Sequence, residues 1–292
     1  MSEAWRTRHD RNAALATHRH REAYAALVLD GDYTESSLDG PLPCAPGTLV
    51  LHPPFHAHGD RFGRSGASAI NLELSAGLPA SASLRPGVLA DAGFAARAWR
   101  VHDLREAREV FERAPQRLGE LLACAAPQAA AALPDWQGEL LRRMAQDERE
   151  IAELARELGV SAEHASRALG RSFGMSPRAL RREARWRRAL QLLGAPMALA
   201  QVAAAAGFAD QSHLHRIVVA HAGCTPLQLR RELAQGRLPA SADASADASA
   251  DASADASADA SARSSGQGRA GSRRLDAGQI KCVQDSPPAL AA

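Results

Sequence analysis

The sequence predicts an α+β protein in which an N-terminal β-barrel or sandwich precedes an all-α region. Three features lead to this prediction. Short apolar runs separated by Gly and Pro occupy residues 15–74, apolar residues recur at helical spacing after about residue 90, and two copies of one helix-turn-helix pattern follow between residues 151 and 223. The 292 residues, 46% of them hydrophobic, are enough for two small domains with separate cores.

The cysteine content indicates where in the cell the protein is located, whereas the net charge does not identify a binding partner. The formal net charge is only +2, but the basic residues are arginine apart from Lys281, and many of them lie between residues 149 and 237. Four scattered cysteines fit neither a disulfide scaffold nor a cysteine-based zinc site. The charged N-terminus and the lack of any run of about 20 apolar residues argue against a signal peptide or a membrane span. We therefore expect a cytoplasmic protein with no membrane partner.

The N-terminal runs have the features of β-strands. Residues 23–29 (AYAALVL) form an apolar run that ends at Asp30-Gly31, a pair that favours a hairpin turn. Residues 47–54 (GTLVLHPP) form a second run, which two prolines stop, and residues 69–74 (AINLEL) alternate between apolar and polar as a half-buried strand does. Short strands of this kind predict a sandwich or a small barrel.

Helical patterns replace the strand patterns after about residue 90. Residues 104–126 carry amphipathic stripes that either mediate dimerisation or cover the barrel. Residues 127–136 are interpreted as part of a linker, and a denser helical region is expected from about residue 139 to residue 233. From residue 241 a Ser-Ala-Asp-Ala tetrad repeats up to residue 260, with too little apolar bulk to form a core, and this tail is predicted to be disordered.

Residues 151–177 follow the plan of a helix-turn-helix unit. Apolar residues at i, i+3, i+4 and i+7 from Ile151 form one stripe, Gly159 suits a left-handed turn, and Ser161 suits the start of a second helix. The outward positions of that second helix can reach base edges or phosphates. They are Glu163, Ser166, Arg167 and Arg171.

A second copy of this plan starts at Leu199, where an alanine-rich stripe ends at Gly207. Phe208 is expected to fill the core at the turn, and Asp210 is expected to cap the next helix. The outward positions of that helix are Gln211, Ser212, His213 and Arg216. Between the two copies, residues 176–194 predict a connecting helix of about 25 Å, roughly the length that places two recognition helices in successive major grooves.

Together these motifs resemble the paired helix-turn-helix domain of AraC-type transcription regulators. The resemblance covers residues 151–233 and includes the segments IAELARELGVS, GMSP and GFADQSH. It implies that the second helix of each unit enters the major groove of double-stranded DNA, at the eight outward residues named above. It also implies a homodimer that is controlled by a small-molecule effector and acts with RNA polymerase.

The N-terminal region contains two histidine-rich segments, HRHRE (residues 18–22) and HPPFHAH (residues 52–58). In extended segments His18 and His20 point the same way, as do His56 and His58, so the two pairs can converge on one site. The order of these motifs resembles the cupin-type barrel that AraC-type regulators often carry as a sensing domain. Three interpretations stay open: a divalent metal, a metal-free effector pocket, or histidines with only a structural role.

The leading hypothesis is therefore a transcription regulator that is not an enzyme and has no certain cofactor. The alternative is a metal-dependent cupin enzyme, a dioxygenase or isomerase, with an appended helical domain. The expected regions are a cupin-like sensing and dimerisation domain at 1–126, a linker at 127–145, a DNA-binding domain at 146–237 and a low-complexity tail at 238–292.

Overall fold

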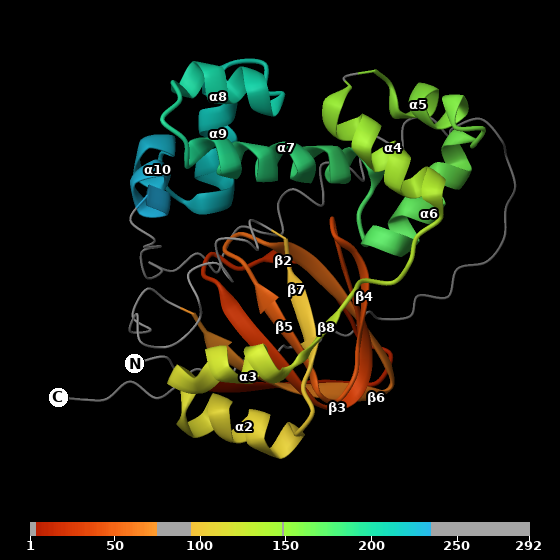
Figure 1. Cartoon of the computed structure of the whole chain (residues 1–292). Coiled ribbons are helices and arrows are strands. Elements are labelled where there is room, and N and C mark those ends of the chain that lie inside the picture. Colours follow the sequence, from red (N-terminus) through yellow and green to blue (C-terminus); the bar gives the residue numbers. More distant parts are fainter. Residues whose placement is uncertain (1–3, 75–94, 148, 235–292) are drawn as a thin grey trace, which may run out of the picture. The chain divides into compact units, whose positions relative to one another are not determined.

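The computed structural model describes residues 4–74, 95–147 and 149–234, and the tail predicted to be disordered lies outside them. An antiparallel sheet domain precedes a helical region, which confirms the predicted fold class (Figure 1). The strands are β1 Ala4–His9, β2 Ala14–Arg19, β3 Tyr24–Ser37, β4 Gly40–Cys44, β5 Thr48–His52, β6 Ala57–Glu73, β7 Arg97–Arg100 and β8 Ala126–Gln128. They pair in the order β1-β6-β3-β5-β7-β8, with β2 also on β6 and β4 also on β3.

The two long strands β3 and β6 pair over most of their length and form the centre of the sheet. Alternation along β3 sends Ala25 and Leu27 to one face, where they pack with helices α2 (Leu104–Arg113) and α3 (Leu118–Cys124). Val28 belongs to a second apolar cluster with residues of β4, β5 and β7. The apolar stripe predicted for residues 104–126 therefore covers the sheet. A break at Pro115 separates the two helices.

Helix α4 (Asp135–Gln146) begins within the stretch interpreted as a linker and runs through the start of the expected helical region. Leu140 and Met144 are fully buried in the same cluster as Leu154 and Leu169, so α4 belongs to the core of the first helix-turn-helix unit. At the other end of the expected linker, β8 pairs with β7 in the sheet. The packing of α4 and the pairing of β8 with β7 depend on residues distant in the sequence. The Ala- and Pro-rich composition of this stretch therefore does not predict them.

The remaining helices form two units around one long helix. The first unit contains α5 (Ile151–Glu157) and α6 (Ala162–Phe173), the second contains α8 (Leu199–Ala206) and α9 (Gln211–Ala222), and α7 (Pro177–Leu193) connects them. Helix α10 (Pro226–Ala234) follows the second unit. Leu180, near the start of α7, packs in the core of the first unit, whereas Trp186 and Leu190 pack in the core of the second. Among the described residues, none of the helices combines the length and apolar character that a membrane span requires.

Candidate functional site

The first candidate recognition helix, α6, begins at the residue that the sequence predicts. The Ser161 hydroxyl accepts a hydrogen bond of 3.2 Å from the backbone N–H of His164, and Gly174 ends the helix in the left-handed conformation at φ 68°. Ala165 and Leu169 are buried in the core of the unit. All four residues proposed to face DNA are exposed: Glu163, Ser166, Arg167 and Arg171.

The second candidate recognition helix, α9, repeats this construction. The Asp210 carboxylate accepts a hydrogen bond of 2.6 Å from the backbone N–H of His213, and Gly223 ends the helix at φ 66°. Leu214 and Val218 are fully buried, and Phe208 from the turn packs in the same cluster. Gln211, Ser212 and Arg216 are exposed, as predicted.

Two histidines of α9 differ from the sequence interpretation. The ring of His213 is half-buried, lies edge-on to Phe208 at 5.2 Å, and its Nδ1 atom accepts a hydrogen bond of 3.4 Å from the backbone N–H of Ala209. Its ring therefore contacts its own turn. His215, which the sequence analysis did not select, is exposed beside Arg216. The signal that could have found His215 is its place between buried Leu214 and exposed Arg216.

Helix α7 has the predicted start and length. The Ser176 hydroxyl accepts a hydrogen bond of 3.3 Å from the backbone N–H of Ala179, Pro177 occupies the first turn, and the helix has 17 residues. Its arginines have different surroundings. Arg178, Arg182 and Arg188 are exposed, whereas the side chain of Arg187 is only 11% exposed and binds Asp39 of the sheet domain.

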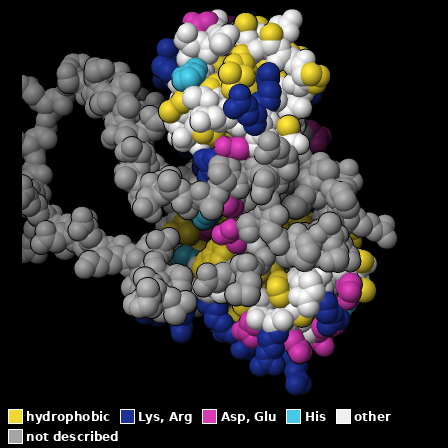
Figure 2. Space-filling view, turned by 90° about the vertical axis from the view of Figure 1, so that its left-hand side faces the viewer, with side chains coloured by type: hydrophobic (Ala, Val, Ile, Leu, Met, Phe, Trp, Pro, Cys, Tyr) yellow, Lys and Arg dark blue, Asp and Glu magenta, His cyan; other side chains and the backbone are white. Residues whose placement is uncertain are grey.

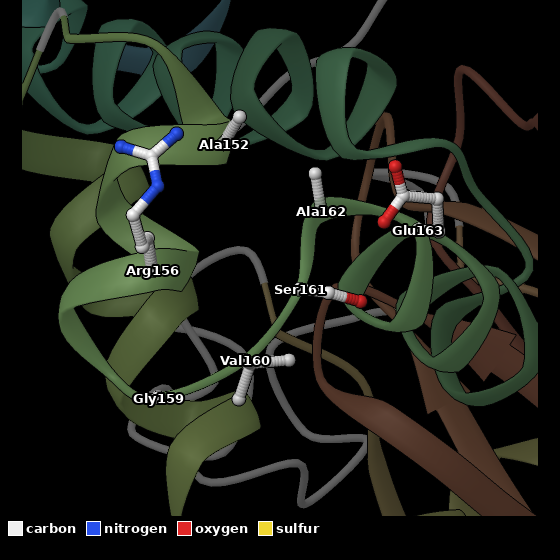
Figure 3. Close-up of a pocket in the computed structure, with 7 residues that line it drawn as sticks. All are labelled: Ala152, Arg156, Gly159, Val160, Ser161, Ala162 and Glu163. Atoms are coloured by element: carbon white, nitrogen blue, oxygen red, sulfur yellow. The ribbon is translucent and has the colours of Figure 1, made fainter.

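Figure 2 shows the side of the molecule on which α8, α9 and α10 lie in Figure 1, with arginine side chains among uncharged ones. A hollow of about 460 Å³ lies at the turn of the first unit. Figure 3 shows Arg156 of α5 on one side of this hollow and Ala162 and Glu163 of α6 on the other. The hollow is thus the groove between the two helices of the unit.

The sheet domain brings five histidines together on and beside β2, β5 and β6. Strand register explains their meeting, because His18 pairs with His58 across β2 and β6, and Tyr24 pairs with His52 across β3 and β5. His56 precedes β6 and its ring centroid lies 5.5 Å from those of both His52 and His58. The structure thus brings His18 and His20 to His58, and it brings His52 and His56 to His58 from the other strand and loop, so two groups share one histidine.

Candidate ligand atoms lie close together in this cluster. One group of nitrogens within 4.8 Å of one another comes from His18, His20 and His58, and another comes from His52, His56 and His58. Burial lowers the pKa of His52, His56 and His58, and the neighbouring imidazoles add to this effect for His52 and His58. Neutral imidazoles are able to bind a metal or to hydrogen-bond an effector.

Two charged contacts connect this part of the sheet domain to α7. Asp39 accepts a hydrogen bond of 3.0 Å from His56 and two from the Arg187 guanidinium, at 2.5 and 3.0 Å. Arg19 donates a hydrogen bond of 2.8 Å to the buried carboxylate of Glu183. Burial by itself would raise the pKa of Asp39, but the His56 hydrogen bond and the Arg187 charge together hold that pKa well below its usual range.

A comparison with protein-family models matches residues 154–232 to a helix-turn-helix domain. A search of curated proteins finds no significant match. Among solved structures, ToxT from Vibrio cholerae is 11% identical, with a TM-score of 0.35, and covers 79% of this chain and 98% of its own. ToxT of strain SCE256 with bound unsaturated fatty acid is 12% identical, with a TM-score of 0.37, over 82% of this chain and 98% of its own. Salicylate 1,2-dioxygenase from Pseudoaminobacter salicylatoxidans is 19% identical, with a TM-score of 0.23, over 24% of this chain and 21% of its own.

Proposed function

We propose, from the AraC-type helix-turn-helix domain at residues 154–232, that the protein is a sequence-specific transcription regulator that binds double-stranded DNA in the cytoplasm. The observation that carries this proposal is the pair of capped, 12-residue helices α6 and α9, one in each unit that α7 connects. Both have one buried face and one exposed polar face. A helix of this kind fits the major groove and reads base edges with its outward side chains.

The residues proposed to contact DNA fall into two kinds. Arg167 and Arg216 can donate two parallel hydrogen bonds to guanine, which discriminates between bases. The exposed arginines of α7 are better placed for phosphates, because a phosphate contact requires charge and reach but no particular base. Loss of a phosphate contact should weaken binding to every DNA sequence and reduce the salt dependence of the affinity. Loss of a base contact should weaken binding mainly to the selected sequence.

We further propose that a small molecule bound in the sheet domain controls DNA binding. The contacts Asp39–Arg187 and Arg19–Glu183 support this proposal, because they join the strands and loops around the histidines directly to α7. A ligand that binds one arrangement of these contacts better than another shifts the population of DNA-binding arrangements. We also propose that the protein acts as a homodimer and that it contacts RNA polymerase.

The test of DNA binding uses the purified full chain. Fragments bound from a random-sequence DNA pool are enriched, sequenced and assayed against scrambled fragments at several salt concentrations. The expected result is affinity for the selected sequence at least about 10³-fold above that for scrambled DNA. Equal affinity for both at every salt concentration would contradict sequence-specific regulation. Repeating the assay with candidate metabolites then tests effector control.

A metal-dependent cupin enzyme is the second candidate, and the histidine cluster is the observation that favours it. The two functions predict different results for the purified protein. An enzyme would turn over a substrate at a rate that depends on the histidines and is independent of DNA. A regulator would show DNA binding that responds to the sheet domain's ligand without consuming it.

A further inference from the structure

The buried part of the histidine cluster has the chemistry of a metal site. His52 ends β5, His56 lies in the following loop and His58 is near the start of β6. One ring nitrogen from each lies within 4.8 Å of the others, and the three residues are only 2%, 2% and 3% exposed. Ligand nitrogens at this spacing need only small adjustments to bind a single ion with metal–nitrogen bonds of about 2.0–2.1 Å.

The Nε2 atom of each of these rings already has a partner. His56 Nε2 lies 3.0 Å from Asp39 Oδ2, His58 Nε2 lies 3.2 Å from the Tyr24 hydroxyl, and His52 Nε2 lies 3.5 Å from Glu35 Oε2. A histidine that binds a metal commonly gives its other ring N–H to a carboxylate or similar acceptor, which fixes the ring's orientation and makes it a stronger ligand. Because these contacts involve Nε2, the Nδ1 atom of each ring is available as a metal ligand.

The Nδ1 atoms of the same three rings are buried and have no hydrogen-bond partner within the described part of the chain. Buried polar atoms are almost always satisfied by protein, water or an ion, so three of them in one cluster call for an explanation. A cation bound by their lone pairs would satisfy all three. Two carboxyl groups also lie beside the cluster, because one oxygen each of Glu35 and Asp60 lies within 4.8 Å of a ring nitrogen of His58.

His18 and His20 offer a weaker alternative. The Nε2 atoms of these two rings lie 3.1 Å from each other, and His18 Nδ1 lies 3.0 Å from the backbone oxygen of Ala16. The Nδ1 atom of His18 is therefore engaged, whereas the 3.1 Å between the two Nε2 atoms fits a hydrogen bond when one ring is protonated there and equally fits two ligands of one ion. His20 is exposed, so water can satisfy it. The buried Nδ1 atoms without a partner belong to His52, His56 and His58, of which His58 is common to both groups.

We propose that His52, His56 and His58 bind one divalent transition metal ion of the zinc class through their Nδ1 atoms. The Nε2 atoms of the three rings contact Glu35, Asp39 and Tyr24, and these contacts fix the orientation of the rings. Because Asp39 also binds Arg187 of α7, the presence of the ion would be transmitted to the DNA-binding region through a single carboxylate. Only this last consequence rests on the proposed function, since the metal site itself depends on the sheet domain alone.

The test uses the full chain freed of metal by a chelator and titrated with Co²⁺, whose visible absorption reports its ligands, and then with Zn²⁺ in competition. We expect one ion per chain. His52→Ala should weaken binding at least 100-fold, whereas His18→Ala and the exposed control His102→Ala should change it less than about threefold. Tyr24→Phe, which removes only the hydroxyl behind His58, should weaken binding about 10–100-fold.

Two results would overturn the metal site: no stoichiometric ion, or loss of the ion in His18→Ala with retention in His52→Ala. Circular dichroism of each variant shows whether it folds, and His52→Asn provides a smaller change if the alanine variant does not. DNA binding is measured separately with and without the ion. A chain that binds its DNA but no metal refutes only the inference, and a chain that binds metal but no DNA refutes only the proposed function.

Discussion

The two helix-turn-helix units share one construction but present different surfaces. Counting from the capping residues Ser161 and Asp210, the sixth position is an exposed arginine in both units, Arg167 and Arg216. At the second position the first unit has Glu163, where the second has Ser212. The two helices therefore share their packing and their arginine, whereas the first turn of each differs in charge.

The largest effect is expected in the two cores. Leu169 of α6 and Leu214 of α9 are both 0% exposed and belong to different apolar clusters. Leu169→Ala and Leu214→Ala should each lower the free energy of unfolding by about 2–5 kcal/mol, since each removes buried methyl groups and leaves a cavity. Denaturant titration measures the loss, and hydrogen exchange shows which unit opens.

If the two cores are independent, Leu169→Ala lowers protection in α5 and α6 more than in α8 and α9, and Leu214→Ala does the reverse. Equal loss of protection in both units from either substitution would show that α7 makes them a single cooperative structure. The two helix-turn-helix units could then not be treated as independent DNA-binding units.

The next effect is expected at the shared arginine position. Arg167→Ala and Arg216→Ala should each weaken binding to the selected DNA by about 1–3 kcal/mol if the arginine makes a paired contact with a base. Binding to scrambled DNA should change much less. Arg113→Ala, an exposed arginine at the end of α2, is the matched control. Equal losses on both DNAs would assign that arginine to a phosphate.

A third effect is expected from Asp39, which contacts the helix that both units share. Asp39→Asn removes the charge that binds Arg187 and should lower the free energy of unfolding by about 1–3 kcal/mol at neutral pH. The folded-state pKa of Asp39 is depressed, so its contribution is present above the unfolded pKa of about 3.9 and is lost as pH falls through the folded value. The wild type should therefore lose stability on acidification, relative to the variant, below about pH 4.

Unfolding curves of both proteins between neutral pH and pH 2 measure this difference. Asp30→Asn, at an exposed carboxylate on β3, is the control and should leave the curve unchanged. A constant gap between wild type and Asp39→Asn at every pH would show that the charge of Asp39 is not what stabilises the contact.

The sequence predicts the helix-turn-helix units well because their signals are local. The caps Ser161 and Asp210, and the glycines Gly159 and Gly207 in the turns before them, can be read within a few residues of one another. The start of helix α4 at Asp135 was not predicted because Ala and Pro dominate the preceding stretch, although Leu140 and Met144 have helical spacing.

The histidine site was only partly predictable for a different reason. The pairs His18–His20 and His56–His58 are visible as alternating residues, but the partners of each ring depend on strand register. Asp39 and Glu35 approach the histidines from other segments of the chain, and no spacing in the sequence indicates this. Long-range pairing therefore determines which nitrogens are left free.

The smallest effect is expected at the position where the units differ. Glu163 is exposed near the start of α6, where its charge opposes the approach of a phosphate backbone. Glu163→Gln should strengthen binding to scrambled DNA by less than about 1 kcal/mol and should steepen its salt dependence slightly. Ser212→Glu places the same charge at the equivalent position of α9 and should weaken binding by a similar amount. If Glu163→Gln instead weakens binding to the selected sequence alone, Glu163 accepts a hydrogen bond from a cytosine amino group, and the first unit reads a base through its acid.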